Sequence, residues 1–387
     1  MSDNDYMRMC FALAEKGLNN VSPNPRVGAV IVSGKSKIIG EGFHREYGKA
    51  HAEVNAIEDA RLRLKSEANN TLKTSTIYVN LEPCSHYGKT PPCADLIIEC
   101  GIPRVVISCC DPNPRVNGNG IEKLRNAGIE VITGVLEQEG RWINRRFFTR
   151  IEKHRPYIIL KWAQTADGFM PSTRITSDKT QEENHFMRAN EDAIMVGTNT
   201  LLHDNPQLNN RLYNGGKNPL RISFDLNERV LKTLETSATI NFFDGTSPTL
   251  IFTTNDVKYP NAETEIINSS EPILPQVMQA LYARNINSLI VEGGANLLQS
   301  FIDNNLWDEI CIFEANTEEL LKLQRLRRAS AEMKERTEVR DRVSNEAQRR
   351  YLKNLEVPAP KLPINTKFYN QHTSDTDTIS RYIKNAD

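Results

Sequence analysis

The sequence has little net charge and no long apolar run. Its 387 residues carry a formal net charge of −1, so the chain lacks the basic field that would favour nucleic acid as its main partner. The absence of a long uncharged apolar run argues against a membrane span. The N-terminal stretch MSDNDYMRMC has acidic residues where a secretory signal peptide would place positive charge before an apolar run. We therefore expect a cytoplasmic protein with neither nucleic-acid nor membrane partners.

Cysteine is scarce outside one short region. The chain has seven cysteines, and only Cys10 and Cys311 lie outside residues 84–110. Disulfides are not expected in a reducing compartment, so the clustered cysteines are predicted to be metal ligands or core residues. Three of them are expected to be small core residues, namely Cys100, Cys109 and Cys110.

The chain does contain enough apolar material for more than one core. Hydrophobic residues make up 39% of it, and its length predicts two domains or more. In its first part, short β-rich runs alternate with helical segments, which predicts an α/β layered sheet. The expected strands are residues 27–32, 37–43, 75–83, 104–109 and 129–134, the first two as a hairpin. The expected helices are residues 51–65, 93–101 and 120–128.

A charged segment at residues 144–157 marks the expected junction between two domains. The runs YIILKWAQ, DAIMVG, LRISFD, TLIFTT and SLIVEGG follow it, with a helix near QEENHFMRA, and they predict a second α/β domain. The last residues, 367–385, are expected to form a closing hairpin. We place the two domains at residues 1–146 and 155–387.

Residues 317–354 differ in character from the rest of the chain. They are dense in charge, contain neither glycine nor proline, and offer many oppositely charged pairs at helical spacing. This pattern predicts one or two charged helices inserted near the C-terminus of the second domain. A solvated helix and a helix that binds a partner are both compatible with the thin apolar stripe.

Three potential metal ligands stand in short segments of the first domain. His51 and Cys93 each begin a predicted helix, where the partial positive charge of the helix N-terminus favours a thiolate over a thiol. Cys84 follows Pro83 at the end of a predicted strand. Two thiolates and one neutral imidazole leave one open position on a tetrahedral zinc ion, which is typical of catalytic rather than structural sites.

Glu53 stands two residues after His51 and is placed to carry a proton. Zinc lowers the pKa of a bound water to about 7, and the hydroxide that forms needs a nearby proton carrier. The combination H-x-E, Pro-Cys and a second Cys is a signature of zinc nucleobase deaminases. A closed structural zinc site, with His44 or His86 as the fourth ligand, is the alternative.

With these residues in view, the sequence resembles the bifunctional deaminase–reductase family of riboflavin biosynthesis. The stretches SPNPRVGAVIV, GFHREYGKAHAEVNAI, LEPCSHYGKTPPCADLII and DPNPRVNGNGI are similar to that family's deaminase domain. The stretches KWAQTADG, VGTNTLLHDNPQL, LRISFD and VEGGANLL are similar to its reductase domain. The resemblance spans residues 5–314 and implies a three-layer cytidine-deaminase-like domain followed by a dihydrofolate-reductase-like α/β domain.

The resemblance also implies two successive reactions on one substrate class. A diaminopyrimidinone that carries a phosphoribosylamino group loses an exocyclic amine in the zinc domain, and NADPH then reduces its ribosyl chain to ribityl. By position, His51, Cys84 and Cys93 would bind zinc and Glu53 would shuttle protons. The residues that would contact the substrate of the deaminase are Asn24, His44, His86 and Lys89, the last two on the phosphate side.

In the second domain, the resemblance implies a cofactor site and a substrate site. Gly293 and Gly294 stand between a predicted strand and a predicted helix, where backbone N–H groups can face a phosphate. The cofactor site would comprise Ala163, Arg174, Thr200, Asp204, Gly293, Gly294, Ala295 and Asn296. The substrate site would comprise Lys161, Ser172, Arg188, Leu208, Arg211 and Glu292. The family's reductase domains commonly pair, so a homo-oligomer is expected.

Two other functions are left open by the charged insert. If the insert disrupts the last strands, the chain would be a deaminase whose reductase half is no longer functional. Alternatively, the chain would be a non-enzymatic zinc scaffold that binds a partner through the charged helix.

Overall fold

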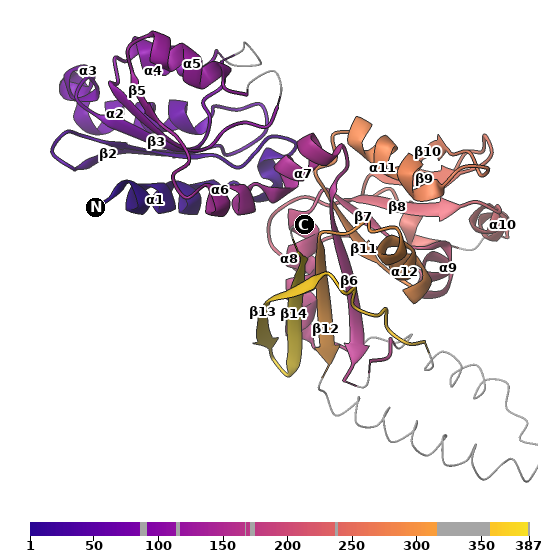
Figure 1. Cartoon of the computed structure of the whole chain (residues 1–387). Helices are drawn as coiled ribbons and strands as arrows, with labels where there is room; N and C mark the ends of the chain where they lie inside the picture. Colours follow the sequence, from indigo (N-terminus) through magenta and orange to yellow (C-terminus); the bar gives the residue numbers. More distant parts are fainter. Residues whose placement is uncertain are drawn as a thin grey trace, which may run out of the picture. The chain divides into compact units, whose positions relative to one another are not determined.

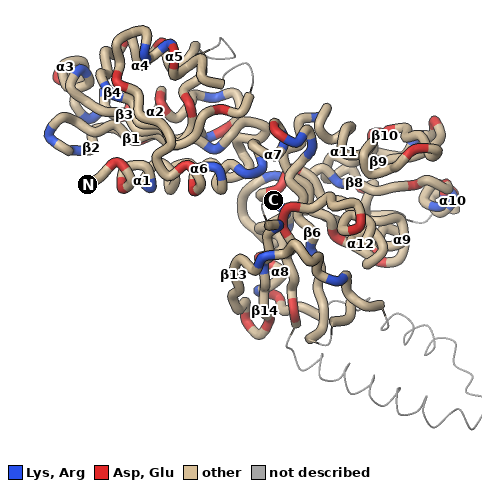
Figure 2. The backbone as a smooth tube through the Cα atoms, viewed as in Figure 1, with Lys and Arg blue, Asp and Glu red and all other residues tan. Residues whose placement is uncertain are grey.

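The computed structural model describes residues 1–85, 91–113, 117–166, 168–170, 175–236, 239–315 and 357–385. Within these residues the chain forms two compact units. The first unit comprises Met1–Pro156 with Leu281–Asn287, and the second comprises Tyr157–Ala280 with Ser288–Asp387. The charged helices expected at residues 317–354 lie outside the described residues. Lys and Arg are interspersed with Asp and Glu over both units (Figure 2).

The first unit is built on a mixed five-stranded sheet. Its strands are β1 (Gly28–Val32), β2 (Ile38–Phe43), β3 (Thr76–Leu81), β4 (Arg104–Cys109) and β5 (Glu130–Ile132). They lie in the order β2-β1-β3-β4-β5. β1 is antiparallel to β2 and to β3, whereas β3, β4 and β5 are parallel to one another.

Helices cover both faces of this sheet (Figure 1). They are α1 (Asp3–Glu15), α2 (Ala52–Leu64), α3 (Ala68–Leu72), α4 (Cys93–Glu99), α5 (Asn119–Asn126), α6 (Glu137–Ile143) and α7 (Arg145–Lys153). Because side chains alternate along a strand, Ala29 and Ile31 of β1 pack with residues of α2, α4 and α5, while Val30 packs with residues of α1. The unit therefore has three layers.

The β1–β2 hairpin lies unusually close to α2, and small residues make this possible. A Cβ atom on Gly42 would stand 2.3 Å from the backbone nitrogen of Ala56, and one on Gly40 would stand 2.2 Å from the Ala56 carbonyl oxygen. On the helix side, Ala52, Ala56 and Ala60 are fully buried. This contact fixes the N-terminus of α2, which carries His51 and Glu53.

The described residues of the second unit form a nine-stranded sheet. Its strands are β6 (Tyr157–Thr165), β7 (Ala193–Met195), β8 (Leu220–Asp225), β9 (Thr249–Thr253), β10 (Glu263–Ile266), β11 (Ser288–Glu292), β12 (Glu309–Ala315), β13 (Thr366–Ser374) and β14 (Asp377–Lys384). They lie in the order β10-β9-β8-β7-β11-β6-β12-β14-β13. In this order, each of the first seven strands, which end at β12, is parallel to its neighbour. β14 is antiparallel to β12, and β13 is antiparallel to β14.

The central strands are buried along their length, as is typical of parallel sheets that are covered on both faces. The helices are α8 (Asp178–Asn190), α9 (Thr198–Asp204), α10 (Arg229–Glu235), α11 (Ile273–Ala283) and α12 (Ala295–Asp303). One core joins Ile159, Ile194 and Ile290 of the sheet to Met187 of α8 and Leu201 of α9. This packing brings α8 and α9 against the sheet beside the ends of β7 and β11.

The predicted α/β elements are confirmed, including the first hairpin and the closing β13–β14 hairpin, which turns at Asp375. The segment expected to be a junction is largely the helix α7, because Phe147 and Phe148 are buried against Leu81 and Cys109. Helices α1, α3, α6, α9 and α10 and strand β10 had no counterpart among the predicted elements. Cys100 and Cys109 are buried as expected.

The expectation for Cys110 was wrong. Its side chain is exposed, because it lies one residue beyond the end of β4, where the chain leaves the sheet.

Candidate active site

Three donor atoms converge where β3, α2 and α4 meet. His51 Nδ1 lies 3.3 Å from Cys93 Sγ and 3.6 Å from Cys84 Sγ. All three donor atoms lie within 4.8 Å of one another. Two sulfurs and one imidazole nitrogen at this spacing fit a zinc ion and leave one of its four tetrahedral positions for water or substrate.

Local backbone geometry places each of these donors. His51 is the N-cap of α2, and Cys93 is the first residue of α4, after the N-cap Pro92. The backbone N–H of Cys93 donates to Cys84 Sγ over 3.3 Å, and the N–H of Ala94 donates to the Cys84 carbonyl. Hydrogen bonds from Cys93 and His51 lower the pKa of the Cys84 thiol, which favours the thiolate that a metal requires.

Glu53 lies in the first turn of α2 beside the three donors. Its side chain is buried, and its Oε2 has no hydrogen-bond partner among the described residues. Burial and the charge of Cys84 raise the pKa of Glu53 to about 7. A carboxyl group with a pKa near neutrality can both accept and deliver a proton at working pH.

Asn24 and His44 lie next to this cluster. The His44 and His51 rings meet edge to face with centroids 5.3 Å apart. His44 Nδ1 faces the Ala50 carbonyl at 3.1 Å, so it carries the proton, and its Nε2 accepts from Asn24 Nδ2 over 3.3 Å. Both ring nitrogens of His44 are therefore engaged, which argues against His44 as a fourth zinc ligand.

A buried carboxylate braces the strand end that carries Cys84. Glu82 is two residues before Cys84, and its carboxylate accepts backbone N–H groups of the loop that leads from β4 to α5 and of the first turn of α5. The donors are Asp111, Gly118, Gly120 and Ile121, at 2.9 to 3.3 Å. Nothing in the sequence marked Glu82 except its position in front of Pro83-Cys84.

A second cluster of charged side chains lies in the other unit. Lys161 of β6 and Glu292 of β11 are register partners, and Lys161 Nζ lies 3.8 Å from Glu292 Oε1. Arg188 of α8 donates to Glu292 Oε2 over 2.8 Å. Against the effect of burial, the charges of Arg188 and Lys161 lower the pKa of Glu292 to about 2. Burial lowers the pKa of Lys161, so the ionised Glu292 and Arg188 form the main pair of this cluster, next to the end of a parallel strand.

Beyond Glu292, two helix N-termini meet at the ends of the adjacent strands β7 and β11. Gly293 has a φ of 133°, and the Gly294 N–H donates to Thr200 Oγ1 of α9 over 3.0 Å. Gly294 is the N-cap of α12, so Ala295 and Asn296 stand in its first turn. Asp204 lies one turn after Thr200 on α9, and Ala163 is on β6. The N–H groups of a helix's first turn have no partner within the helix, so the N-terminus of α12 suits an anionic cofactor.

Two models of protein families match the chain. The model described as "Cytidine and deoxycytidylate deaminase zinc-binding region" matches residues 1–109, and the one described as "RibD C-terminal domain" matches residues 156–316. The riboflavin biosynthesis protein RibD of Aquifex aeolicus is 40% identical over 330 residues, which cover 81% of this chain and 86% of that protein. The chain belongs to the RibD family.

Solved structures agree with this family assignment. A diaminohydroxyphosphoribosylaminopyrimidine deaminase/5-amino-6-(5-phosphoribosylamino)uracil reductase from Thermotoga maritima is 34% identical, with a TM-score of 0.78 and coverage of 99% of this chain and 98% of that one. RibD of Acinetobacter baumannii is 28% identical, with a TM-score of 0.76. The expected fold class, a cytidine-deaminase-like domain followed by a reductase domain, is confirmed.

Membership of the RibD family also confirms the expected function. The chain is a bifunctional enzyme of riboflavin biosynthesis, a hydrolytic deaminase and a reductase, with zinc and NADPH as its cofactors. Every helix in the described part of the chain is too short or too polar to traverse a bilayer.

The structure brings most of the expected site residues of this RibD family member into two groups, but four lie outside the described residues. Leu208 is buried and has a φ of 51°, while Arg211 is exposed and its backbone N–H donates to His185 Nδ1 over 3.1 Å. His185 had not been expected near the site, because a histidine on a helix carries no motif of its own. The four that lie outside are His86, Lys89, Ser172 and Arg174.

Proposed function

We propose that His51, Cys84 and Cys93 hold the catalytic zinc and that Glu53 is the proton carrier of the deaminase. The convergence of the three donors is the observation that carries this assignment. When bound, zinc supplies a water that is ionised at neutral pH. Glu53 takes up one proton from the water and delivers it to the ring nitrogen. It then takes up a second proton, from the hydroxyl group now on the ring carbon, and delivers it to the amine, which leaves as ammonia. Its buried Oε2, which has no protein partner among the described residues, is available for each transfer in turn.

The residues around this cluster would bind a small phosphorylated pyrimidine. The hydrogen bond between Asn24 and His44 holds both side chains in place, so they can orient the base and the ribose without further rearrangement. His86 and Lys89 are proposed for the phosphate side, because cationic and N–H donors are the usual partners of phosphate.

Replacing Glu53 by Gln tests the proton-carrier assignment. Gln keeps the size and polarity of Glu but cannot carry the proton, so ammonia release should fall by a factor of about 100 to 10,000. NADPH oxidation by the same chain, supplied with the deaminated intermediate, should be unchanged. Glu58→Gln, on the exposed side of the same helix, is the matched control. Ammonia release by Glu53→Gln at the native rate would remove Glu53 from the mechanism.

For the reductase, we propose that the buried charge cluster faces the substrate and the glycine turn faces NADPH. NADPH supplies the hydride. Arg188 and Arg211 suit the substrate phosphate because guanidinium binds it bidentately. The proposed substrate residues are Lys161, Ser172, Arg188, Leu208, Arg211 and Glu292. The proposed cofactor residues are Ala163, Arg174, Thr200, Asp204, Gly293, Gly294, Ala295 and Asn296. On this assignment, residues 1–146 carry the deaminase activity and residues 155–387 carry the reductase activity.

We further propose that the enzyme is a cytoplasmic homo-oligomer. The edge strand β13 and the segment before it expose Ile364, Phe368 and Tyr369, and such apolar exposure suits a protein interface. The zinc thiolates need a reducing compartment. Analytical ultracentrifugation and cell fractionation test the two parts, and a monomer at micromolar concentration would contradict the first.

A further inference from the structure

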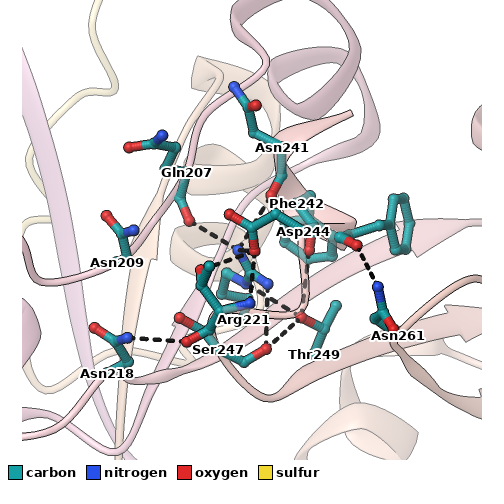
Figure 3. Close-up of polar contacts among 12 residues, drawn as sticks. Gln207, Asn209, Asn218, Arg221, Asn241, Phe242, Asp244, Ser247, Thr249 and Asn261 are labelled. Atoms are coloured by element: carbon teal, nitrogen blue, oxygen red, sulfur yellow. Dashed lines mark hydrogen bonds and ion pairs between the residues drawn. The ribbon is translucent and has the colours of Figure 1, made fainter. Parts of the chain in front are cut away.

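Arg221 of β8 is a fully buried arginine whose donors face strand β9 and the segments around residues 207 and 241–247. Its side chain has no exposed surface, and its one carboxylate partner among the described residues is the exposed Asp244, with Nη1 and Oδ1 3.0 Å apart. Nη1 also donates to the backbone carbonyls of Gln207 and Asn241, and Nη2 donates to that of Ser247 (Figure 3). Nε donates to Thr249 Oγ1 over 3.1 Å. A buried guanidinium with its N–H groups satisfied in this way fixes the position of each acceptor.

One of these acceptors belongs to an irregular segment, Asn205–Arg211, that leads into the proposed substrate site. Two of its residues, Asn205 and Leu208, have positive φ values of 43° and 51°. Asn205 is the C-cap of α9, where Asn adopts this conformation readily, but Leu208 is strained there and has to be held by contacts with the rest of the unit. The segment follows α9 directly, which makes it the connection between the proposed cofactor helix and the proposed substrate residues.

Side chains from outside the segment hold it at several points. Asn205 accepts two hydrogen bonds from Asn241, one from the backbone N–H to its Oδ1 and one from Nδ2 to its carbonyl, and the Asn241 carbonyl is itself bound by Arg221. The Gln207 carbonyl is bound by Arg221, and the Asn210 N–H donates to Asn218 Oδ1 over 2.8 Å. The strained Leu208 therefore lies between two anchored positions.

The last anchor is His185 of α8. Its Nδ1 accepts the backbone N–H of Arg211, so the proton of the neutral ring is on Nε2. The ring is fully buried, and burial together with the charges of Arg188 and Arg211 lowers its pKa to about 4, which keeps Nδ1 free to accept. His185 also lies one helical turn before Arg188, so one helix face carries both the anchor for Arg211 and the partner of Glu292.

We propose that Arg221 and His185 are positioning residues that hold the segment Asn205–Arg211 in its strained conformation and thereby set the affinity of the reductase for its substrate. The proposal rests on the assignment of Leu208 and Arg211 to the substrate site. The cofactor turn at Gly293–Gly294 is bound to Thr200 near the start of α9, whereas the segment begins after the end of α9, so loss of either anchor should change the affinity for NADPH much less than the affinity for the substrate.

The test measures KM and kcat of the reductase with the deaminated intermediate and with NADPH, on the full chain. Arg221→Met keeps an apolar chain in the buried site but releases the Gln207 carbonyl. Displacement of the segment should raise KM for the substrate about tenfold or more, with KM for NADPH within about twofold of the native value. Ile310→Ala, in the buried core of β12, weakens the same unit without touching the segment and should leave both KM values within about twofold.

A pair of variants at His185 provides a second measurement in case Arg221→Met does not fold. Asn can present its Oδ1 near the position of Nδ1, so His185→Asn should keep the anchor and stay within about threefold of the native KM, whereas His185→Leu should raise KM about tenfold. Equal KM values for the native enzyme and His185→Leu, or an equal rise in KM for substrate and NADPH, would overturn the proposal.

Arg211→Ala separates this proposal from the assignment on which it rests. If both Arg211→Ala and Leu208→Ala leave KM for the substrate unchanged, the segment does not contact the substrate, and both the assignment and the positioning role fail. If Arg211→Ala raises KM while His185→Leu and Arg221→Met do not, only the positioning role fails.

Discussion

Replacing Arg188 by Met should destabilise the second unit strongly, and a second substitution at Glu292 should reverse most of the loss. The two side chains form an ion pair of 2.8 Å, and only about a tenth of each is exposed. Met removes the charge of Arg188 and leaves the Glu292 carboxylate with Lys161 alone, at 3.8 Å. Breaking one side of a buried pair typically costs about 3–5 kcal/mol, because the remaining charge stays buried.

The pKa of Glu292 gives an independent magnitude for the free energy that the ionised carboxylate contributes to folding. Burial opposes ionisation, but the charges of Arg188 and Lys161 lower the pKa from 4.5 to about 2. At about 1.4 kcal/mol per pKa unit, the ionised carboxylate stabilises the folded unit by about 3 kcal/mol at pH 7. A lowered pKa contributes stability above the unfolded value, so this contribution is fully present above about pH 5 and is lost as the pH falls from 4.5 towards 2.

Calorimetric melting of four proteins tests this reasoning: the native chain, Arg188→Met, Glu292→Gln and the double variant. At pH 7, Arg188→Met should lower the melting temperature of the second unit by about 10 °C. The double variant should recover most of that loss, which gives a coupling of about 3 kcal/mol in the cycle. Lys232→Met, on exposed α10, is the control for charge removal. A coupling below about 0.5 kcal/mol, or an unchanged acid dependence in Glu292→Gln, would refute the account.

Three further outcomes are expected. A tight zinc chelator should stop ammonia release and leave NADPH oxidation nearly intact, and a parallel loss of both activities would contradict separate sites. Gly42→Ala should lower the free energy of unfolding by about 1–3 kcal/mol, because the added methyl group would meet the Ala56 backbone. The zinc content, measured by atomic emission, should fall as well. A native melting temperature would show that the contact is not tight. Glu82→Gln should lower the free energy of unfolding by about 1–3 kcal/mol and speed amide hydrogen exchange at Gly118 and Gly120, whose N–H groups Glu82 binds. Unchanged exchange at these two glycines would show that Glu82 does not hold the loop after β4.

The sequence was most informative where function depends on short-range pattern. His51 and Glu53 are two residues apart at a helix start, and Cys84 and Cys93 each stand at a boundary marked by proline. Each boundary is set by local chemistry, so the donors could be predicted without knowledge of the tertiary fold. Their roles stay predictions until the zinc and the Glu53→Gln variant are measured.

The sequence was least informative where a site depends on distant partners. Arg188 and Glu292 lie 104 residues apart in the chain, and only the pairing of β6 with β11 and the packing of α8 bring them together. Resemblance to a family could suggest both residues, but neither periodicity nor composition could. His185 and Arg221 were missed altogether, because a buried histidine or arginine has the same sequence context as an exposed one.

Both candidate sites lie at the carboxyl ends of parallel strands, and this explains why two different chemistries could be placed on similar sheets. Cys84 follows β3, and its brace Glu82 reaches the loop that follows β4, the parallel neighbour of β3. Glu292 ends β11 and the helix α9 begins after β7, again parallel neighbours. Because parallel strands deliver successive loops to the same edge, residues from separate stretches of sequence meet there. The antiparallel hairpin β13–β14 does not deliver its loop to the same edge as the parallel strands, and none of the proposed site residues lies on it.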